Sequence, residues 1–377
     1  MSRLILLIAA TFIFAIGLIM IFSTTSAEVL DHDLDKSMHG SLVKQMLFAI
    51  AGVVLGLLIW KIGYQRLIDL SPALLVFFTF LLLLTLLPGI GREVNGSKRW
   101  LSIFGLSFQP SEFVKYLVPA FLIHSFSVFE DRIMSCKEFF KILGLAAIPM
   151  FLILIEPNNG TFAVIAMSVL LLSFLARISF KYWALPLLCF LVVGGAFAYN
   201  LPYVAARLKV YLHPELDLRG KGHQPYQAKI AAGSGALFGK GPGNSLQKLS
   251  YLPEAQNDYI AAIFAEEFGF LGIIVLILLY MVFALCGFFI AFQQQEMQGF
   301  YMASTIVFLI SFQAFLNLGV VSGTLPSTGL NLPLFSQGGT SLMANIAAIG
   351  LLLNISKQKD IIPIRQRAVK ESLNDYI

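Results

Sequence analysis

Long apolar segments alternate with short polar ones along almost the whole chain. A membrane-spanning helix needs about 20 apolar residues, and ten segments of this kind occur, near 4–23, 45–63, 70–88, 111–129, 138–155, 160–176, 182–200, 259–292, 299–319 and 341–356. Segment 259–292 is longer than one perpendicular crossing requires, so we expect part of it to be tilted or to lie at the membrane edge. The pattern predicts an all-α integral membrane protein with about ten transmembrane helices.

Composition supports this fold class. Hydrophobic residues make up 58% of the chain and charged residues only 12%, and the mean hydropathy is +0.81. These values exclude a soluble globular protein. We expect a multi-pass protein of the cell (inner or plasma) membrane with no nucleic-acid partner.

The distribution of Lys and Arg predicts the topology. An even number of spans places both termini on one side, and short cytoplasmic loops carry an excess of Lys and Arg. With segment 201–258 and Lys115 left out, 13 such residues lie on the side of the termini and 5 on the other. We therefore predict cytoplasmic termini, a large extracytoplasmic loop at 201–258 between spans seven and eight, one membrane domain over 1–357, and a short cytoplasmic tail over 358–377.

The predicted outward segments 89–110, 201–258 and 320–340 hold most of the Gly, Pro, Asn, Gln and charge. Segment 320–340 has too many Pro and Gly residues for a regular helix, so at membrane depth it must be buried in protein or line a cavity. We expect a polar cavity at the outer leaflet, and the candidates for its lining are Gln227, Asn317 and Ser336.

Three carboxylates stand at the head of the eighth span. An ionised side chain deep in a bilayer costs roughly 2.5 to 3.5 kcal/mol on insertion scales, so such acids are functional candidates. Asp258 lies where loop becomes helix and stays within reach of a polar substrate. Glu266 would lie about 12 Å deeper on a continuous helix, and we interpret it as a structural residue that caps polar groups between spans.

Glu112 and Lys115 form a second charged group, at the head of the fourth span. They are three residues apart and therefore neighbours on one helix face. In one interpretation the pair neutralises itself and holds the helix bundle together. In the other it sets the charge state of a nearby acid.

The long outward loop is basic and rich in glycine. Glycines let backbone amides approach an anion closely, and Lys and Arg add positive charge. Arg207, Lys240 and Lys248 are therefore candidates for binding a phosphate-bearing ligand, although glycine-rich loops often only turn the chain.

Four motifs occur in order along the chain: NGSKRW with QPSEFVK, IEPNNGT, YQAKIAAGSG with GKGPGNSLQKLSYLPEAQNDYIAAIFAEEFGFLG, and NLGVVSGTLPSTGLNLPLFSQGGTS. With them, the chain resembles the SEDS family (shape, elongation, division and sporulation) from about residue 5 to 357. The run NSLQKLSYLPEA looks more like the division member FtsW than the elongation member RodA. Three positions depart from family patterns: Asn158 replaces an acid, Thr328 the Lys of an FtsW-type motif, and Gln337 a Tyr.

The resemblance implies a peptidoglycan glycosyltransferase that polymerises lipid II, the undecaprenyl-pyrophosphoryl disaccharide-pentapeptide. The family acid falls on Asp258, which would act as general base or would hold a divalent cation, Mg or Mn. Glu112 and Lys115 would lie near the active site, and Arg207, Lys240 and Lys248 would bind the pyrophosphate. No organic cofactor is implied.

The resemblance also implies a partner and a place. A class B penicillin-binding transpeptidase with a single transmembrane helix would cross-link the strands, other division proteins would join the complex, and the complex would work at the division septum. Three alternatives stay open: a lipid II flippase or transporter, for which a polar cavity would also serve, a RodA-like elongation polymerase, and a non-catalytic scaffold.

Overall fold

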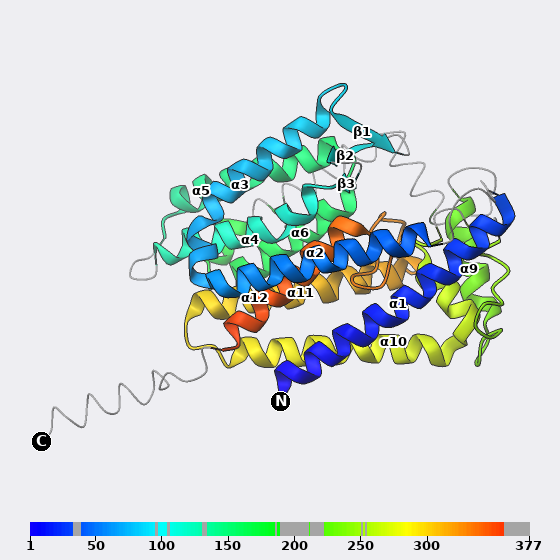
Figure 1. Ribbon diagram of the computed structural model, residues 1–377. Helices are drawn as coiled ribbons and strands as arrows, with labels where there is room; N and C mark the ends of the chain where they lie inside the picture. Colours follow the sequence, from blue (N-terminus) through cyan, green and yellow to red (C-terminus); the bar gives the residue numbers. More distant parts are fainter. Residues whose placement is uncertain are drawn as a thin grey trace, which may run out of the picture.

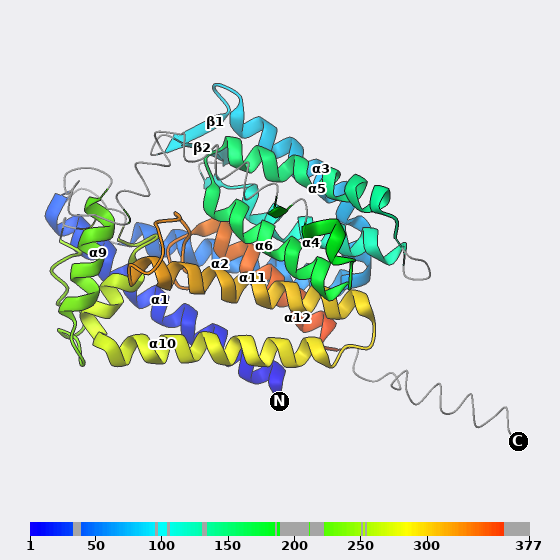
Figure 2. The same cartoon turned by 180° about the vertical axis from the view of Figure 1, so that it is seen from behind.

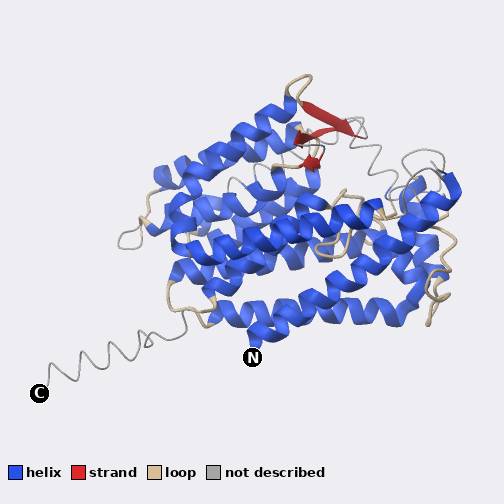
Figure 3. Cartoon of the chain, viewed as in Figure 1, coloured by secondary structure: helices blue, strands red, loops and turns tan. Residues whose placement is uncertain are grey.

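The computed structural model describes residues 1–32, 39–94, 97–103, 106–129, 134–184, 187–188, 211, 222–249, 252 and 255–357. Helices dominate it (Figure 3). Their bounds are α1 (Ser2–His32), α2 (Gly40–Ile62), α3 (Tyr64–Leu86), α4 (Ser111–Ser127), α5 (Cys136–Ile155), α6 (Asn159–Leu175), α9 (His223–Ser234), α10 (Ile260–Phe292), α11 (Met297–Val321) and α12 (Gly339–Ile355).

The helical membrane architecture expected from the hydropathy pattern is confirmed. Six of the described helices, α1, α2, α3, α5, α10 and α11, are long and apolar enough to cross a membrane, and α6 and α12 are shorter apolar helices. The expected span 182–200 and the expected tail 358–377 lie largely or wholly outside the described residues. The count of ten spans and the placement of the long loop therefore stay predictions.

A small antiparallel sheet adds an element that the hydropathy pattern did not predict. Within the segment 89–110, expected to be an outward loop, β1 (Gly91–Val94), β2 (Ser97–Ile103) and β3 (Leu106–Phe108) pair in the order β1-β2-β3. In the sequence, β1 and β2 are separated by Asn-Gly, the dipeptide most typical of a two-residue hairpin. The sheet lies at one end of the helix bundle (Figure 1).

Helix α10 is broken near its start, as its excess length indicated. Gly269 has φ 67° and ψ −166°, a conformation that is essentially confined to glycine. A Cβ added at Gly269 would lie 2.3 Å from the backbone nitrogen of Gly239, so the break is also where the glycine-rich loop approaches the helix. The break leaves a short helical segment, 260–268, which begins two residues after Asp258.

The chain between α11 and α12 is not helical, and it is partly buried and partly lines a cavity, as expected for 320–340. Leu330, Leu332, Leu334 and Phe335 are all buried there. Figures 1 and 2 show this segment enclosed by the helices, with α1 and α10 side by side along one edge of the bundle. A non-helical segment enclosed in this way presents backbone groups to the interior, where side chains must satisfy them.

Candidate functional site

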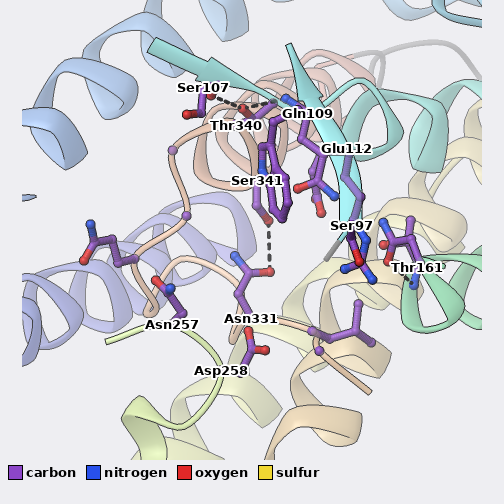
Figure 4. Close-up of a pocket in the computed structure, with 18 of the residues that line it drawn as sticks. Ser97, Ser107, Gln109, Glu112, Thr161, Asn257, Asp258, Asn331, Thr340 and Ser341 are labelled. Carbon is purple, nitrogen blue, oxygen red and sulfur yellow. Dashed lines mark hydrogen bonds between the residues drawn. The ribbon is translucent and has the colours of Figure 1, made fainter. Parts of the chain in front are cut away.

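A polar cavity of about 670 Å³ opens beside the sheet. Its described lining comes from α2, the sheet, the starts of α4, α6 and α12, helix α9, the turn before α10, and segment 327–331. Figure 4 shows side chains from these separate elements converging on one space. The polar cavity expected from the composition of the outward segments is therefore present.

Asp258 lies on the wall of this cavity, in the turn that leads into α10. Its side chain is half-buried, and its backbone carbonyl accepts a hydrogen bond of 2.8 Å from Nδ2 of Asn317. A Cβ added at Gly329 would lie 3.8 Å from Oδ2 of Asp258, which places the carboxylate against segment 327–331. The acid is thus exposed to the cavity and held from behind by α11.

Glu112 and Lys115 form the ion pair that their spacing predicted. Lys115 Nζ lies 2.9 Å from Glu112 Oε2, and the two side chains are only 2% and 7% exposed, respectively. The same Nζ donates to Oε1 of Gln313 on α11 at 2.9 Å. Glu112 and Asp258 both line the cavity, and the charge of the Glu112 carboxylate is balanced by Lys115.

Three basic residues belong to the described lining of the cavity: Lys44 of α2, Arg92 of β1 and Arg99 of β2. Arg99 is held in place by the backbone, because its Nε donates to the carbonyl of Glu156 at 2.9 Å and its Nη2 to that of Pro157 at 2.6 Å. None of the three was singled out from the sequence. The sequence could have indicated Arg99 as a site residue, since it belongs to the NGSKRW motif.

Lys240 and Lys248, predicted to bind the pyrophosphate, lie in ion pairs with the start of α10. Lys240 Nζ is 2.6 Å from Glu266 Oε1, and Lys248 Nζ is 2.8 Å from Glu267 Oε1. Within the described part of the chain, neither lysine is among the residues lining the cavity. The physical reason is that Glu266 and Glu267 are buried and need opposite charges nearby. The third candidate, Arg207, lies outside the described residues.

Glu266 has the structural role expected for it. Its carboxylate accepts hydrogen bonds from the Ser245 hydroxyl at 2.6 Å and from the backbone amides of Leu246 and Gln247 at 3.3 Å. Glu266 therefore binds the glycine-rich loop to α10. The sequence predicted only how deep along the helix this acid lies, not which groups it would bind.

The three residues predicted to line the cavity are not among its described lining residues. Gln227 is on α9, but Gln224, one turn earlier, is the α9 residue that lines the described cavity. The Ser336 hydroxyl accepts from the amide of Leu332 at 2.8 Å, within its own segment. The side chain of Asn317 binds backbone carbonyls and is 1% exposed.

The three departures from the family patterns gather at this cavity. Asn158, Thr328 and Gln337 all line it, although Asn158 precedes α6 and the other two belong to the connection between α11 and α12. Asn158 caps α6 by accepting from the amide of Thr161 at 3.4 Å, and its Nδ2 donates to Ser111 Oγ at 3.3 Å. An amide can donate in this way where an ionised acid could only accept.

Glu156 is a buried acid next to the site. It follows the end of α5, is 1% exposed, and accepts a hydrogen bond from Thr85 through Oε1. Burial raises the pKa of Glu156 to about 8, although the Thr85 hydroxyl and the Arg99 charge oppose the rise. Its protonation state therefore changes near neutral pH.

The residues fit a divalent cation only in part. Among the residues that the structure describes, no three His, Cys, Asp or Glu side chains form a group that could hold a metal ion. The second acid in the described cavity wall, Glu112, is bound to Lys115. A cation at Asp258 would therefore need water or substrate oxygens as most of its ligands, as Mg²⁺ commonly does.

Comparison with known proteins places the chain in a family. The cell cycle protein family FtsW/RodA/SpoVE matches residues 3–361. Stage V sporulation protein E of Bacillus subtilis is 37% identical over 355 residues, covering 94% of this chain and 96% of that protein. A probable peptidoglycan glycosyltransferase FtsW of Trichlorobacter lovleyi is 34% identical over 374 residues, covering 97% of this chain and 96% of that protein.

Solved structures agree with the sequence comparison. A chain from a structure on the coordination of polymerization and crosslinking by a peptidoglycan synthase complex has a TM-score of 0.75 and 25% identity, covering 95% of this chain and 98% of that one. The rod shape determining protein RodA of Thermus thermophilus has a TM-score of 0.67 and 25% identity, covering 95% of this chain and 97% of that one. Because both sequence and fold match over nearly the whole length, this chain belongs to the FtsW/RodA/SpoVE family of membrane proteins.

Proposed function

We propose that this protein is a peptidoglycan glycosyltransferase that polymerises lipid II into glycan strands. The observation that carries the proposal is a carboxylate, Asp258, on the wall of a polar cavity that also holds three basic side chains. The names of the FtsW relatives as probable peptidoglycan glycosyltransferases support the same reaction.

In this reaction the 4-hydroxyl of the acceptor sugar attacks the anomeric carbon of the donor. A glycosidic bond forms, the bond from the anomeric carbon to the pyrophosphate oxygen breaks, and the hydroxyl loses a proton. Asp258 would accept that proton as general base. Negative charge develops on the departing lipid pyrophosphate, and positioned cations stabilise it.

Lys44, Arg92 and Arg99 replace Lys240 and Lys248 as the cations we assign to the pyrophosphate. They line the same cavity as Asp258, whereas the two loop lysines neutralise buried acids of α10. Arg99 suits this role because two backbone carbonyls already fix its guanidinium. In the alternative role, Asp258 together with substrate oxygens would hold a Mg²⁺ or Mn²⁺ ion, which would stabilise charge on the leaving group.

The test is polymerisation of labelled lipid II by purified Asp258→Asn protein, with and without a divalent cation. Asn keeps the size of the side chain but accepts no proton at working pH, so we expect the rate to fall by at least about 100-fold, the lower range for general acid–base catalysis. Asp69→Asn is the matched control, since Asp69 is an exposed acid on α3 and is expected to leave the rate unchanged. An Asp258→Asn rate near that of the wild type would refute the assignment, and headgroup translocation without polymer would favour a flippase.

We further propose that the protein works in septal synthesis with a class B penicillin-binding transpeptidase, with both termini in the cytoplasm. The YLPEA run supports the division role, and the similarity to a chain of a peptidoglycan synthase complex supports a partner. A fluorescent fusion expressed at native level distinguishes the roles, because a division polymerase gathers at midcell whereas an elongation polymerase spreads along the cylinder.

A further inference from the structure

Two amide side chains on consecutive turns of α11 point at the non-helical segment behind the cavity. Gln313 and Asn317 are four residues apart and therefore share a helix face. Each is 1% exposed. Polar side chains this deeply buried are costly unless they are hydrogen-bonded, so their partners indicate what they do.

Asn317 binds two backbone carbonyls that belong to different parts of the site. Its Nδ2 donates to the carbonyl of Asp258 at 2.8 Å and to that of Leu330 at 2.7 Å. Both residues line the cavity, Asp258 from the turn before α10 and Leu330 from the segment before α12. One amide group thus joins the turn carrying the proposed base to the adjacent segment 327–331 of the wall.

Gln313 makes the corresponding connection to the ion pair. Its Nε2 donates to the carbonyl and to Oδ1 of Asn331, at 2.9 and 2.8 Å, while its Oε1 accepts from Lys115 at 2.9 Å. Asn331 also lines the cavity, where Figure 4 shows it between Asp258 and Ser341, the residue whose hydroxyl donates to Asn331 Oδ1. The amide donates to Asn331 and accepts from Lys115 at the same time, which an ionised carboxylate, an acceptor only, could not do.

We propose that Gln313 and Asn317 are positioning residues that set the place of Asp258 relative to the Glu112–Lys115 pair. The proposal rests on the function proposed above. The turn before α10 and segment 327–331 belong to no helix or strand, so contacts with neighbouring elements help to fix their place. Helix α11 supplies such contacts, because its two amides hold the consecutive carbonyls of Leu330 and Asn331 together with that of Asp258. Neither amide touches the cavity, so both act through the residues that they hold.

The experiment compares the purified variants Asn317→Leu and Gln313→Met, which keep side-chain shape and remove the hydrogen bonds, in the lipid II polymerisation assay. Thr305→Val is the matched control: Thr305 is buried on the same helix, but its hydroxyl only donates to the carbonyl of Tyr301 within α11. Rates are taken on monodisperse protein at several lipid II concentrations, and thermal unfolding is recorded for each variant.

We expect kcat to fall about 10- to 100-fold in both variants, the loss that a displacement of about 1 Å can cause, while KM for lipid II changes less than about threefold and Thr305→Val keeps the wild-type kcat. A kcat within about twofold of wild type in both variants overturns the proposal. So does failure of both to yield folded protein when Thr305→Val folds, because the amides would then serve the fold alone. If wild-type protein itself makes no polymer, the proposed function fails instead.

Discussion

At the scale of single residues, Glu156 shows how burial alone can make a side chain sensitive to pH. Its pKa is raised from 4.5 to about 8 because the carboxyl is buried, and Oε2 has no hydrogen-bond partner among the residues that the structure describes. Between those two pH values the folded state keeps a proton that the unfolded state has released. The contribution of Glu156 to stability is therefore present below pH 4.5 and falls as pH rises toward about 8.

Glu156→Gln, which stays neutral at every pH, tests this directly. We expect the variant to match the wild-type melting temperature at pH 5 and to exceed it at pH 8.5, because the ionised carboxylate is the unfavourable form in the buried site. Thermal unfolding in detergent at the two pH values measures the difference. Equal melting temperatures of variant and wild type at pH 8.5 would contradict the burial argument.

The Glu112–Lys115 pair makes a prediction about coupling. Removing one partner of a buried pair leaves an uncompensated charge and typically costs about 3–5 kcal/mol, whereas replacing both can be nearly neutral. Glu112→Gln and Lys115→Met should therefore each destabilise the protein more than the double substitution does. Chemical or thermal unfolding of the three variants measures the coupling, and simple additivity of the single effects would show that the residues act independently.

At the scale of elements, the break in α10 separates the short segment after Asp258 from the long apolar helix. Gly239 and Gly269 meet at the break, and the amides of Lys240 and Gly241 donate to the carbonyls of Glu266 and Glu267 at 2.9 and 3.0 Å. The glycine-rich loop thus completes the hydrogen bonding that the break leaves open, so loop and helix form one unit.

Gly269→Ala should disrupt this unit. The residue has φ 67°, a conformation that costs a non-glycine residue about 1–3 kcal/mol, and the added Cβ would press on the Gly239 backbone. We expect a clear fall in thermal stability and a gain in proteolysis of the loop. Gly144→Ala on α5 is the control, because a Cβ there meets nothing within 4 Å, and a loss of stability equal to that of the control would refute the strain.

At the scale of the whole molecule, we expect a complex with a cross-linking enzyme. Long apolar side chains are exposed on α2, α3 and α10, consistent with faces that meet lipid or a transmembrane helix. Co-expression of the chain with a single-span class B transpeptidase, followed by purification through a tag on one protein, should recover both, and the complex should polymerise lipid II faster than the isolated chain. Failure to co-purify in mild detergent, with unchanged activity on mixing, would rule out an obligate complex.

Hydropathy determined the membrane helices, because about 20 consecutive apolar residues have no stable place except the bilayer core. The apolar pattern also gave the excess length of 259–292 and the position of Asp258 at a boundary between loop and helix. The spacing of the charged residues gave the Glu112–Lys115 pair. The small sheet was not predicted, because short strands in a polar segment do not produce a recognisable hydropathy pattern.

Tertiary structure decided which charges meet. Lys240 and Lys248 lie in a basic, glycine-rich sequence that is typical of a phosphate site. In the fold, however, they pair with Glu266 and Glu267. Lys44 and Arg99 line the cavity instead. The partners lie on separate elements, and a side chain pairs with whichever opposite charge packing places nearest to it. For the same reason the role of Gln313 and Asn317 could be inferred only from the structure. Their hydrogen-bond partners are the carbonyls of Asp258, Leu330 and Asn331, which lie next to α11 only in the folded chain.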